Sequence, residues 1–368
     1  MFFYIKANYF STHFLQKTHN YVSQKKKSIY LLVSFTFLFL LQNACTKNEI
    51  TAPQNLTIDD ILQVPSSFPP PLFPDENEFT VARWQLGKKL FYDPILSRDS
   101  SISCASCHLP SYAFSDTTAF SSGVENAAGT RNSPSLANVA YHPYFTREGG
   151  VPTLEMQILI PIQEHNEFDF NIVPLSEKLQ ANEKYQTMAM QAYEQAATPF
   201  VITRALSTFE RSLLSGNSDY DKFAFQNETD ALNEQEKMGM NLFFGEKTNC
   251  SHCHSGFNFT NYAFENNGLY ENYEDVGRFR LTGNEEDMAL FKVPSLRNIL
   301  LTAPYMHDGS MKDLKTVVEH YVSGGENHIH KNEILQPLDL TDEEQAAIIA
   351  FLESLTDYDF INNKLFAP

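Results

Sequence analysis

Two short cysteine motifs, CASCH and CSHCH, carry the most specific chemistry in the sequence. Each is a Cys-x-x-Cys-His string, which is the attachment signature of a c-type haem. Two thiols with this spacing can form thioethers to the haem vinyl groups, and the histidine that follows them can bind the iron from the proximal side. The sequence therefore predicts two covalent haems. The attaching residues are Cys104, Cys107 and His108 in the first motif, and Cys250, Cys253 and His254 in the second.

Other uses of these four cysteines explain less of the pattern. A four-cysteine zinc site tolerates the long stretch between the two pairs, but it does not require a histidine after each of them. A thioredoxin-like redox pair belongs beside a βαβ pattern, and the sequence around neither motif has one. Two disulfides would suit an exported protein, yet they too leave the paired histidines unexplained.

The fifth cysteine, Cys45, follows a segment with the features of an export signal. A basic KKK at 25–27 precedes the apolar run 28–44, and a small residue stands directly before Cys45. This order is typical of a lipoprotein signal, in which the cysteine becomes the lipidated N-terminus. A retained membrane helix is the alternative, but the run is short for a span. We therefore expect a signal peptide at 1–44, a Pro-rich tether at 45–75, and an exported, periplasm-facing protein held to the membrane by a lipid anchor.

The charge of the chain is unevenly distributed. The first 44 residues contain five lysines and no aspartate, glutamate or arginine, whereas the whole chain has a formal net charge of −18. The part after the expected signal is therefore strongly acidic, which argues against nucleic acid as a partner because a polyanion would be repelled. The same charge can steer a basic protein partner toward the surface, although solubility alone also explains it.

The sequences around the two haem motifs repeat in the same order, which indicates a duplicated domain. LGKKLFYD stands before the first motif and MGMNLFFG before the second. PSLANV and then PYFTREGG follow the first motif, and PSLRNI and then PYMHDGS follow the second. We therefore expect two cytochrome c domains, an N-terminal one at 76–225 and a C-terminal one at 226–368.

Hydrophobic periodicity predicts helices around both haem motifs. Apolar residues recur at helical spacing over 80–91 and 199–214, and a further helix is expected from Ser310 to about residue 322. Thr341 and Glu344 form a capping box ahead of an apolar stripe. No run of alternating strands competes with these helices. The expected fold is mainly α, with two consecutive c-type cytochrome domains and long loops that wrap the haems.

These motifs, together with the segments between them, resemble the bacterial dihaem cytochrome c peroxidase and MauG family over residues 87–355. The resemblance implies an oxidoreductase that reduces hydrogen peroxide to water at the N-terminal haem. Electrons would come from a small donor protein, such as a cytochrome or a cupredoxin, and pass through the C-terminal haem. A calcium ion would lie between the domains. The linking segments that carry the resemblance are RNSPSL (131–136), LEMQILIPIQEHNEF (154–168), FKVPSLRN (291–298), LTAPYMHDGS (301–310) and VVEHYVSGG (317–325).

The resemblance also implies two catalytic residues. Glu167 matches the acid-base glutamate of the family, and Gln157 matches its distal-pocket glutamine. A carboxylate held over the iron can move a proton from one peroxide oxygen to the other, which cleavage of the O–O bond requires. By residue type alone, Glu167 would instead be a solvated surface carboxylate beside Glu164 and Asp169.

For calcium, the resemblance implies Asn132 as a side-chain ligand and Thr302 and Pro304 as backbone carbonyl ligands. Neutral oxygens and water are a set that calcium accepts where it holds loops together. The structural alternative is an asparagine that caps the turn before Pro134, and this alternative is compatible with the same role.

Two positions depart from the peroxidases of the family. Val124 stands where they place a loop histidine over the N-terminal iron, so we expect that haem to be open in the resting state. Tyr321 stands where they place a methionine, so we expect it to bind the C-terminal iron as sixth ligand. Both departures are features of the MauG-like branch. Residues that compete with Tyr321 for this position are Met306, Met311, His320, His328 and His330.

The tryptophan that the family places between the haems is also missing, since Thr146 or Arg147 occupies its position. The single tryptophan, Trp84, precedes the first haem motif and is expected in the core. Tyr144 or Phe145 is a candidate substitute in electron transfer.

Three functions follow from these expectations. The first is a peroxidase, the second is MauG-like oxidation of a protein partner with peroxide or oxygen as oxidant, and the third is a dihaem electron carrier without catalysis. Glu167, Gln157 and the missing distal histidine argue against the carrier, in which both irons would be saturated with ligands.

Overall fold

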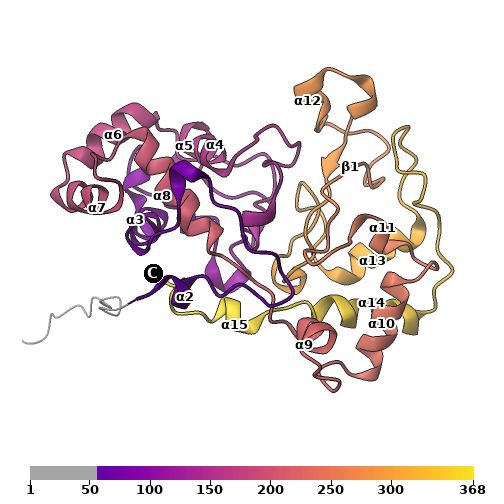
Figure 1. The fold of residues 1–368 in the computed structure, drawn as a ribbon. Helices are drawn as coiled ribbons and strands as arrows, with labels where there is room; N and C mark the ends of the chain where they lie inside the picture. Colours follow the sequence, from indigo (N-terminus) through magenta and orange to yellow (C-terminus); the bar gives the residue numbers. More distant parts are fainter. Residues whose placement is uncertain (1–55) are drawn as a thin grey trace, which may run out of the picture. The chain divides into compact units, whose positions relative to one another are not determined.

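Short helices and long loops make up nearly all of the described chain, residues 56–368 of a computed structural model (Figure 1). The prediction of a mainly α fold is confirmed. Strands within these residues are limited to β1 (Phe264–Glu265) and β2 (Phe291–Lys292), which pair antiparallel, together with isolated bridges. The α-helices are α2 (Ile58–Ile61), α3 (Val81–Tyr92), α4 (Leu154–Gln157), α5 (Leu159–Gln163), α6 (Ile172–Gln180), α7 (Glu183–Tyr193), α8 (Pro199–Arg211), α9 (Asp219–Phe225), α10 (Glu234–Phe244), α11 (Cys250–Cys253), α12 (Phe279–Thr282), α13 (Leu314–Ser323), α14 (Asp342–Glu353) and α15 (Tyr358–Ile361).

Single turns of 3-10 helix occur within the long loops between these helices. They are η1 (Asp75–Asn77), η2 (Pro94–Leu96), η3 (Cys104–Ser106), η4 (Pro110–Tyr112), η5 (Val124–Asn126), η6 (Val139–Tyr141), η7 (Glu285–Asp287) and η8 (Ile299–Leu301). The predicted signal peptide at 1–44 and the first residues of the tether lie outside the described part of the chain. Within that part, no helix is both long enough and apolar enough to cross a membrane.

The rest of the expected tether, 56–75, is not a free linker, and this part of the prediction is wrong. Ile61 in α2 is 2% exposed and Phe68 is 7% exposed. The Phe68 ring lies 4.5 Å from the Phe257 ring, measured between centroids. Burial of apolar side chains against distant residues stabilises this contact, so the segment is part of the folded body.

Three of the helix predictions agree with the structure. The Thr80 hydroxyl caps α3 by accepting a hydrogen bond from the N–H of Arg83. The helix predicted over 199–214 is α8, which ends slightly earlier. Thr341 and Glu344 form the predicted capping box of α14, and the apolar stripe behind them is buried.

The predicted start of α13 is wrong by one turn. The helix begins at Leu314 rather than after Ser310, because the Asp313 carboxylate accepts a hydrogen bond from the N–H of Thr316 over 2.8 Å. Aspartate is as good an N-cap as serine, so residue type alone does not choose between the two positions.

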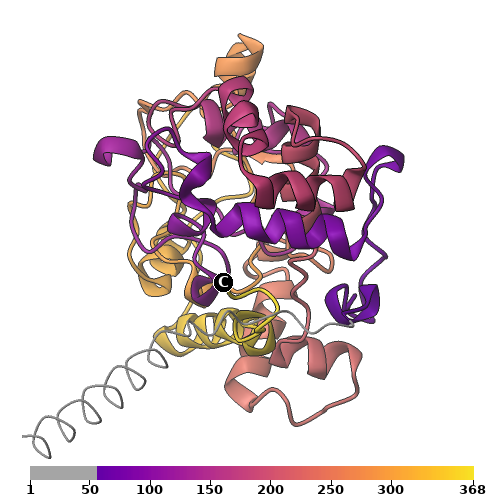
Figure 2. The ribbon, with the colours of Figure 1, turned by 90° about the vertical axis from the view of Figure 1, so that its left-hand side faces the viewer.

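A glycine marks the main helix crossing in each half of the described chain. α3 packs against α8, and α10 packs against α14 (Figures 1 and 2). A Cβ atom at Gly87 of α3 would lie 1.9 Å from the carbonyl oxygen of Ala205 in α8. One at Gly239 of α10 would lie 1.8 Å from the carbonyl oxygen of Ala347 in α14. Only glycine allows backbones to approach so closely, and the predicted internal repeat is therefore visible in the packing.

Two large hydrophobic clusters form most of the core, and a small third one contains Val139, Phe145 and Leu154. Phe91 and Phe209 belong to the first, which lies among α3, α6, α7 and α8, and Phe351 belongs to the second, which lies among α10, α13 and α14. Phe360, close to the C-terminus, packs in the first cluster, whereas Tyr220 of α9 packs against the second. The domain boundary at residue 225 stays a prediction, because the chain crosses between the two clusters more than once.

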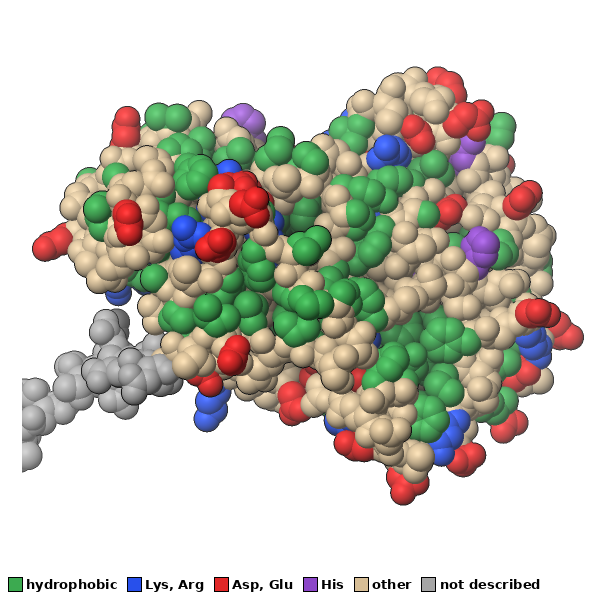
Figure 3. Space-filling model, in the orientation of Figure 1, with side chains coloured by type: hydrophobic (Ala, Val, Ile, Leu, Met, Phe, Trp, Pro, Cys, Tyr) green, Lys and Arg blue, Asp and Glu red, His purple; other side chains and the backbone are tan. Residues whose placement is uncertain are grey.

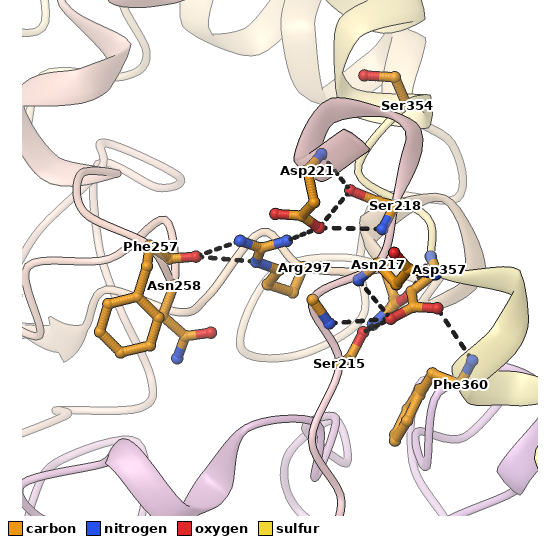
Figure 4. Close-up of polar contacts among 12 residues, drawn as sticks. Ser215, Asn217, Ser218, Asp221, Phe257, Asn258, Arg297, Ser354, Asp357 and Phe360 are labelled. Atoms are coloured by element: carbon orange, nitrogen blue, oxygen red, sulfur yellow. Dashed lines mark hydrogen bonds and ion pairs between the residues drawn. The ribbon is translucent and has the colours of Figure 1, made fainter. Parts of the chain in front are cut away.

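A buried polar network joins α9, the loop after α8 and the C-terminal segment (Figure 4). The Asp357 carboxylate accepts a hydrogen bond from the N–H of Gly216 over 2.9 Å. Arg297 forms an ion pair with Asp221, and both side chains are 1% exposed. The same guanidinium donates to the carbonyl oxygen of Phe257 over 2.9 Å. Loss of one partner of such a buried pair costs about 3–5 kcal/mol, so the network fixes how these segments meet.

Candidate functional site

Both haem motifs form tight turns. The N–H of His108 donates to the carbonyl oxygen of Cys104 over 3.0 Å, and the N–H of His254 donates to that of Cys250 over 3.0 Å. All four motif thiols are half-buried and form no disulfide. Within residues 56–368, no three His, Cys, Asp or Glu side chains lie close enough to hold a metal ion together, so the two pairs do not meet in a four-cysteine zinc site.

The two motif histidines are oriented as iron ligands. Nδ1 of His108 donates to the carbonyl oxygen of Phe114 over 2.8 Å, and Nδ1 of His254 donates to that of Phe259 over 3.1 Å. Because a carbonyl only accepts, the proton of each ring sits on Nδ1 and the lone pair of Nε2 is left for a metal. Burial lowers the pKa of both imidazoles, which keeps them neutral. The residues therefore fit two c-type haems.

Arg297 stabilises the loop that orients His254. Its guanidinium donates to the carbonyl oxygen of Phe257, two residues before Phe259, and thus fixes the loop that holds His254 (Figure 4). The matching position of the first half is Ala137, so the repeat is not exact here. The two motif histidines therefore have the same orientation, but different residues stabilise the loops that hold them.

Glu167 belongs to the half of the chain that contains the first haem motif. It follows α5 and is half-buried, whereas Glu164 is exposed. Burial raises the pKa of both Cys104 and Cys107, and the negative charge of Glu167 is a smaller contribution in each case. Phe168, the next residue, belongs to the hydrophobic cluster against which Cys104 packs. Burial, together with repulsion from Glu164, raises the pKa of Glu167 to about 7. The alternative of a fully solvated surface carboxylate does not describe this environment.

Gln157 ends α4 and is half-buried, and α4 is anchored by its neighbour Glu155. Glu155 forms a buried ion pair with Arg211 of α8. Burial alone would raise the pKa of Glu155, but hydrogen bonds and the charge of Arg211 outweigh it and lower this pKa to about 2. Sequence reasoning missed this pair, although a glutamate and an arginine within apolar helical stretches were a signal for it.

Glu210 is a second carboxyl near the first haem motif that sequence reasoning missed. It is 5% exposed, and its Oε2 has no hydrogen-bond partner among the described residues. Burial raises its pKa to about 8. Burial, followed by the charge of Glu210, raises the pKa of Cys104. The position of Glu210 directly before Arg211, in a buried stretch of α8, was the available signal.

The position of the absent loop histidine is occupied by a buried apolar side chain. Val124 is 2% exposed, and its N–H donates to the carbonyl oxygen of Glu167 over 2.9 Å. His165, two residues before Glu167, faces solvent with a side chain that is 89% exposed, and it contacts Asp169. Neither residue offers an imidazole to the first haem motif.

Tyr321 of α13 belongs to the half of the chain that contains the second haem motif. Burial raises the pKa of its phenol. Leu314 and Val318 of the same helix belong to the hydrophobic cluster against which Cys250 packs. The side-chain amide of Asn267 donates to the Tyr321 oxygen over 3.4 Å and contacts the sulfur of Met306 at 3.3 Å. Tyr321 and Met306 therefore contact the same side-chain amide.

The histidine rivals of Tyr321 have other partners. Nε2 of His320 contacts the carbonyl oxygen of Asn267 at 3.0 Å. His328 contacts the Asn266 amide, and His330 lies 3.9 Å from a carboxylate oxygen of Glu286. Met311 pairs through its backbone with Tyr305 at an isolated bridge.

One of the three expected calcium ligands, Asn132, already has a cationic partner in the structure. Asn132 reaches the second half, because its N–H donates to the carbonyl oxygen of His307 over 2.9 Å. However, the Arg147 guanidinium donates to the backbone oxygen of Asn132 over 2.7 Å and to its Oδ1 over 3.2 Å. The side-chain oxygen of Asn132, which was expected to bind calcium with the carbonyl oxygens of Thr302 and Pro304, is thus already used by a cation of the chain itself.

The region of the missing tryptophan contains tyrosine and histidine. The Tyr144 ring stacks on Phe264 with centroids 5.1 Å apart, and its hydroxyl donates to the carbonyl oxygen of Tyr262. His142 lies 5.3 Å from the Tyr262 ring between centroids and contacts Nζ of Lys292 at 3.5 Å. Sequence reasoning named Tyr144 here but missed the other four, which are Phe264, Tyr262, His142 and Lys292.

Trp84 is 2% exposed and donates to the Ser212 hydroxyl over 2.8 Å. Its expected place in the core is confirmed.

Comparison with known proteins places the chain in a family. A family model described as di-haem cytochrome c peroxidase matches residues 81–230. The methylamine utilization protein MauG of Methylophilus methylotrophus is 34% identical over 305 residues, which is 82% of this chain and 89% of that protein. Cytochrome c551 peroxidase of Nitrosomonas europaea is 33% identical over 278 residues, 74% of this chain and 79% of that protein.

A solved structure shares both fold and sequence. The crystal structure of a MauG-like protein associated with microbial copper homeostasis is 33% identical, with a TM-score of 0.79, and the match covers 83% of this chain and 97% of that one. The motifs, the orientation of both histidines and these similarities agree. The chain belongs to the dihaem cytochrome c peroxidase and MauG family, whose members are oxidoreductases that carry two c-type haems.

Proposed function

We propose that this protein reduces hydrogen peroxide to water at the first haem, with electrons that a small redox protein delivers through the second haem. The observation that carries the proposal is Glu167, a half-buried carboxyl on the side of the first haem motif with a pKa of about 7. A residue with such a pKa can both accept and return a proton at neutral pH. Cys104, Cys107 and His108 would hold the first haem, and Cys250, Cys253 and His254 the second.

The haems supply the electron-transfer chemistry when they are bound. Reduction of one hydrogen peroxide consumes two electrons and two protons and releases two water molecules. Glu167 accepts a proton from one peroxide oxygen and returns it to the other, so that the O–O bond breaks with a water as leaving group. Gln157 orients the peroxide from the end of α4, and the apolar side chain of Val124 leaves room for it.

The second haem would have Tyr321 as its sixth ligand. A phenolate stabilises ferric iron and lowers the potential relative to a methionine ligand. This feature favours the second candidate function, MauG-like oxidation of a protein partner. The 34% identity to a MauG protein supports the same alternative. A plain electron carrier is disfavoured, because it has no use for a carboxyl with a raised pKa beside a haem.

The donor would be a soluble protein outside the cytoplasm. Export and a lipid anchor follow from the expected signal at 1–44. The net charge of −18 favours a donor with a basic docking face. On the face drawn in Figure 3, hydrophobic side chains gather toward the middle and many Asp and Glu side chains lie toward the edges, an arrangement that suits transient docking of a redox partner.

Calcium is not part of the proposed function, since Arg147 uses the oxygens of Asn132.

Steady-state turnover and the resting spin state test the proposal. The purified dihaem protein is mixed with hydrogen peroxide and a reduced monohaem cytochrome c, or with a reduced cupredoxin. We expect two donor equivalents to be oxidised per peroxide, and a high-spin ferric signal from the open first haem. Two low-spin haems without turnover would instead establish the carrier. Stored oxidising equivalents that react with a protein but not with either donor would establish the MauG-like function.

A further inference from the structure

We propose that the guanidinium of Arg147 takes the place of a calcium ion at the junction of the two halves, so that this chain is a calcium-independent member of its family. The proposal concerns one cluster, formed by Arg147, Asn132 and the loop around His307. It does not depend on which reaction the haems catalyse.

Asn132 is held so that both of its oxygens face Arg147. Its side chain is nearly buried, and the residue is 5% exposed. Its Nδ2 donates to the carbonyl oxygen of Thr118 over 3.2 Å, and its backbone N–H donates to that of His307 over 2.9 Å. The donors of Asn132 are therefore used elsewhere, and its two acceptors, the backbone oxygen and Oδ1, are left for a cation.

Arg147 supplies that cation. Its terminal nitrogen donates to the Asn132 backbone oxygen over 2.7 Å and to Oδ1 over 3.2 Å, and its Nε donates to the backbone oxygen over 3.2 Å. Calcium and guanidinium both bind oxygen atoms. A guanidinium does so by donating hydrogen bonds in a fixed geometry, and it requires no water ligands. The two cations would compete for the same oxygens.

This cluster lies where the two halves meet. The backbone oxygen of Arg147 accepts a hydrogen bond from the N–H of Lys292 in β2 over 2.6 Å. A Cβ atom at Gly309 would lie 2.6 Å from the Cα of Ala119 and 3.2 Å from Cγ of Pro304. The loop that contains the expected carbonyl ligand Pro304 thus abuts the segment that holds Asn132. A cation here links both halves, as the calcium of the family is expected to do.

The surrounding charges favour one monovalent cation over an added divalent one. Asp308, Asp275 and Glu148 stabilise the Arg147 guanidinium, while Arg131 opposes it. Burial, followed by the Arg131 charge, lowers the pKa of Arg147 to about 10, so it remains protonated at neutral pH. Calcium placed on Asn132 would be repelled by Arg147 at contact distance and by Arg131 beyond it.

Metal analysis of the dihaem protein gives the first test. After gel filtration without chelator, we expect less than about 0.1 calcium per chain, and we expect EGTA to leave the melting temperature and the haem spectrum unchanged. One calcium per chain, removed by EGTA with a fall in melting temperature, would overturn the proposal. This test needs no variant.

A gain-of-function variant gives the second test. Arg147→Ala frees the oxygens of Asn132, so we expect a lower melting temperature without calcium and a recovery when calcium chloride is added in the millimolar range. Magnesium should not replace calcium, because it demands a smaller octahedral site. Arg280→Ala is the matched control, since Arg280 contacts Glu148 but not Asn132, and its melting temperature should not respond to calcium. An Arg147→Ala protein that is as stable as the parent and indifferent to calcium would overturn the proposal.

Discussion

Val124 and Glu167 are joined by a backbone hydrogen bond of 2.9 Å from the N–H of the valine to the carbonyl oxygen of the glutamate. The position that would carry a loop histidine is thus tied directly to the residue proposed to move the proton. A change at residue 124 therefore acts directly on the backbone that carries Glu167.

Val124→His is expected to close the first haem. An imidazole at this position can bind a ferric iron, so the high-spin signal of the resting protein should give way to a low-spin one. Peroxide turnover of the oxidised protein should fall at least about tenfold, the loss expected when the ligand site is occupied by a competing group, and should recover after partial reduction. Electron paramagnetic resonance checks the spin state. Val124→Ala serves as control and should stay high-spin.

Glu167→Gln should keep both haems but lose peroxide turnover. The amide retains the shape of the side chain and cannot carry the proton, so we expect a loss on the order of 100-fold in kcat. Glu164→Gln is the matched control, because Glu164 is exposed and lies three residues away. Equal activity of the two variants would show that Glu167 has no catalytic role, and it would favour the function of an electron carrier.

The pH dependence of turnover reports on the same group. Burial raises the pKa of Glu167 to about 7, so the carboxyl is mostly protonated below this pH and mostly ionised above it. Only the ionised form accepts a proton from peroxide, and turnover should therefore rise as the pH increases through about 7. The Glu167→Gln variant should lack this inflection. The same inflection in both proteins would assign it to another group.

The buried pair of Asp221 and Arg297 predicts an effect on stability. Asp221→Asn leaves a guanidinium unpaired where both side chains are 1% exposed, which should cost about 3–5 kcal/mol. Asp219→Asn removes an exposed partner of Lys222 and should cost less than about 1 kcal/mol. Denaturation of the dihaem proteins, followed by circular dichroism, compares the two. Equal losses would contradict the proposed importance of the network in Figure 4.

Local features were predictable from the sequence, and long-range pairs were not. The haem motifs and the capping box of Thr341 and Glu344 are short, and their chemistry is complete within a few residues. The wrong tether and the missed Glu155–Arg211 pair have a common cause, since each depends on partners far along the chain. A Pro-rich segment looks extended by composition, and only the fold supplies the surface that buries it.

The Arg147–Asn132 contact shows the same limit at the candidate site. The two residues are 15 positions apart in an irregular loop, where no helical or strand period fixes their relation. A family resemblance assigns Asn132 to calcium, and only the arrangement of the loop brings a guanidinium onto its oxygens. The contacts of Asn132 in the folded chain therefore decide whether its oxygens are available to a metal ion.

The sixth ligand of the second haem separates the two enzymatic functions. The Asn267 amide lies between the Tyr321 oxygen and the Met306 sulfur, at 3.4 and 3.3 Å, so both candidates are held beside the same group. An anionic phenolate stabilises the ferric state, whereas a neutral thioether raises the potential. Replacement of the true ligand should change the spectrum, and replacement of the other should not.

Tyr321→Phe is expected to remove the ligand and raise the potential of the second haem on the order of 100 mV, well within the roughly 0.8 V that axial ligands span. The variant should lose the low-spin ferric signal of this haem while both haems stay attached, because His254 and the two cysteines are untouched. Met306→Leu is the matched control and should leave the spectrum and the potential unchanged. Spectroscopy and potentiometric titration of the two variants check the outcome. A methionine-type charge-transfer band in the parent protein, lost in Met306→Leu and kept in Tyr321→Phe, would assign the ligand to Met306 and make the second haem a high-potential acceptor suited to ordinary peroxidase turnover.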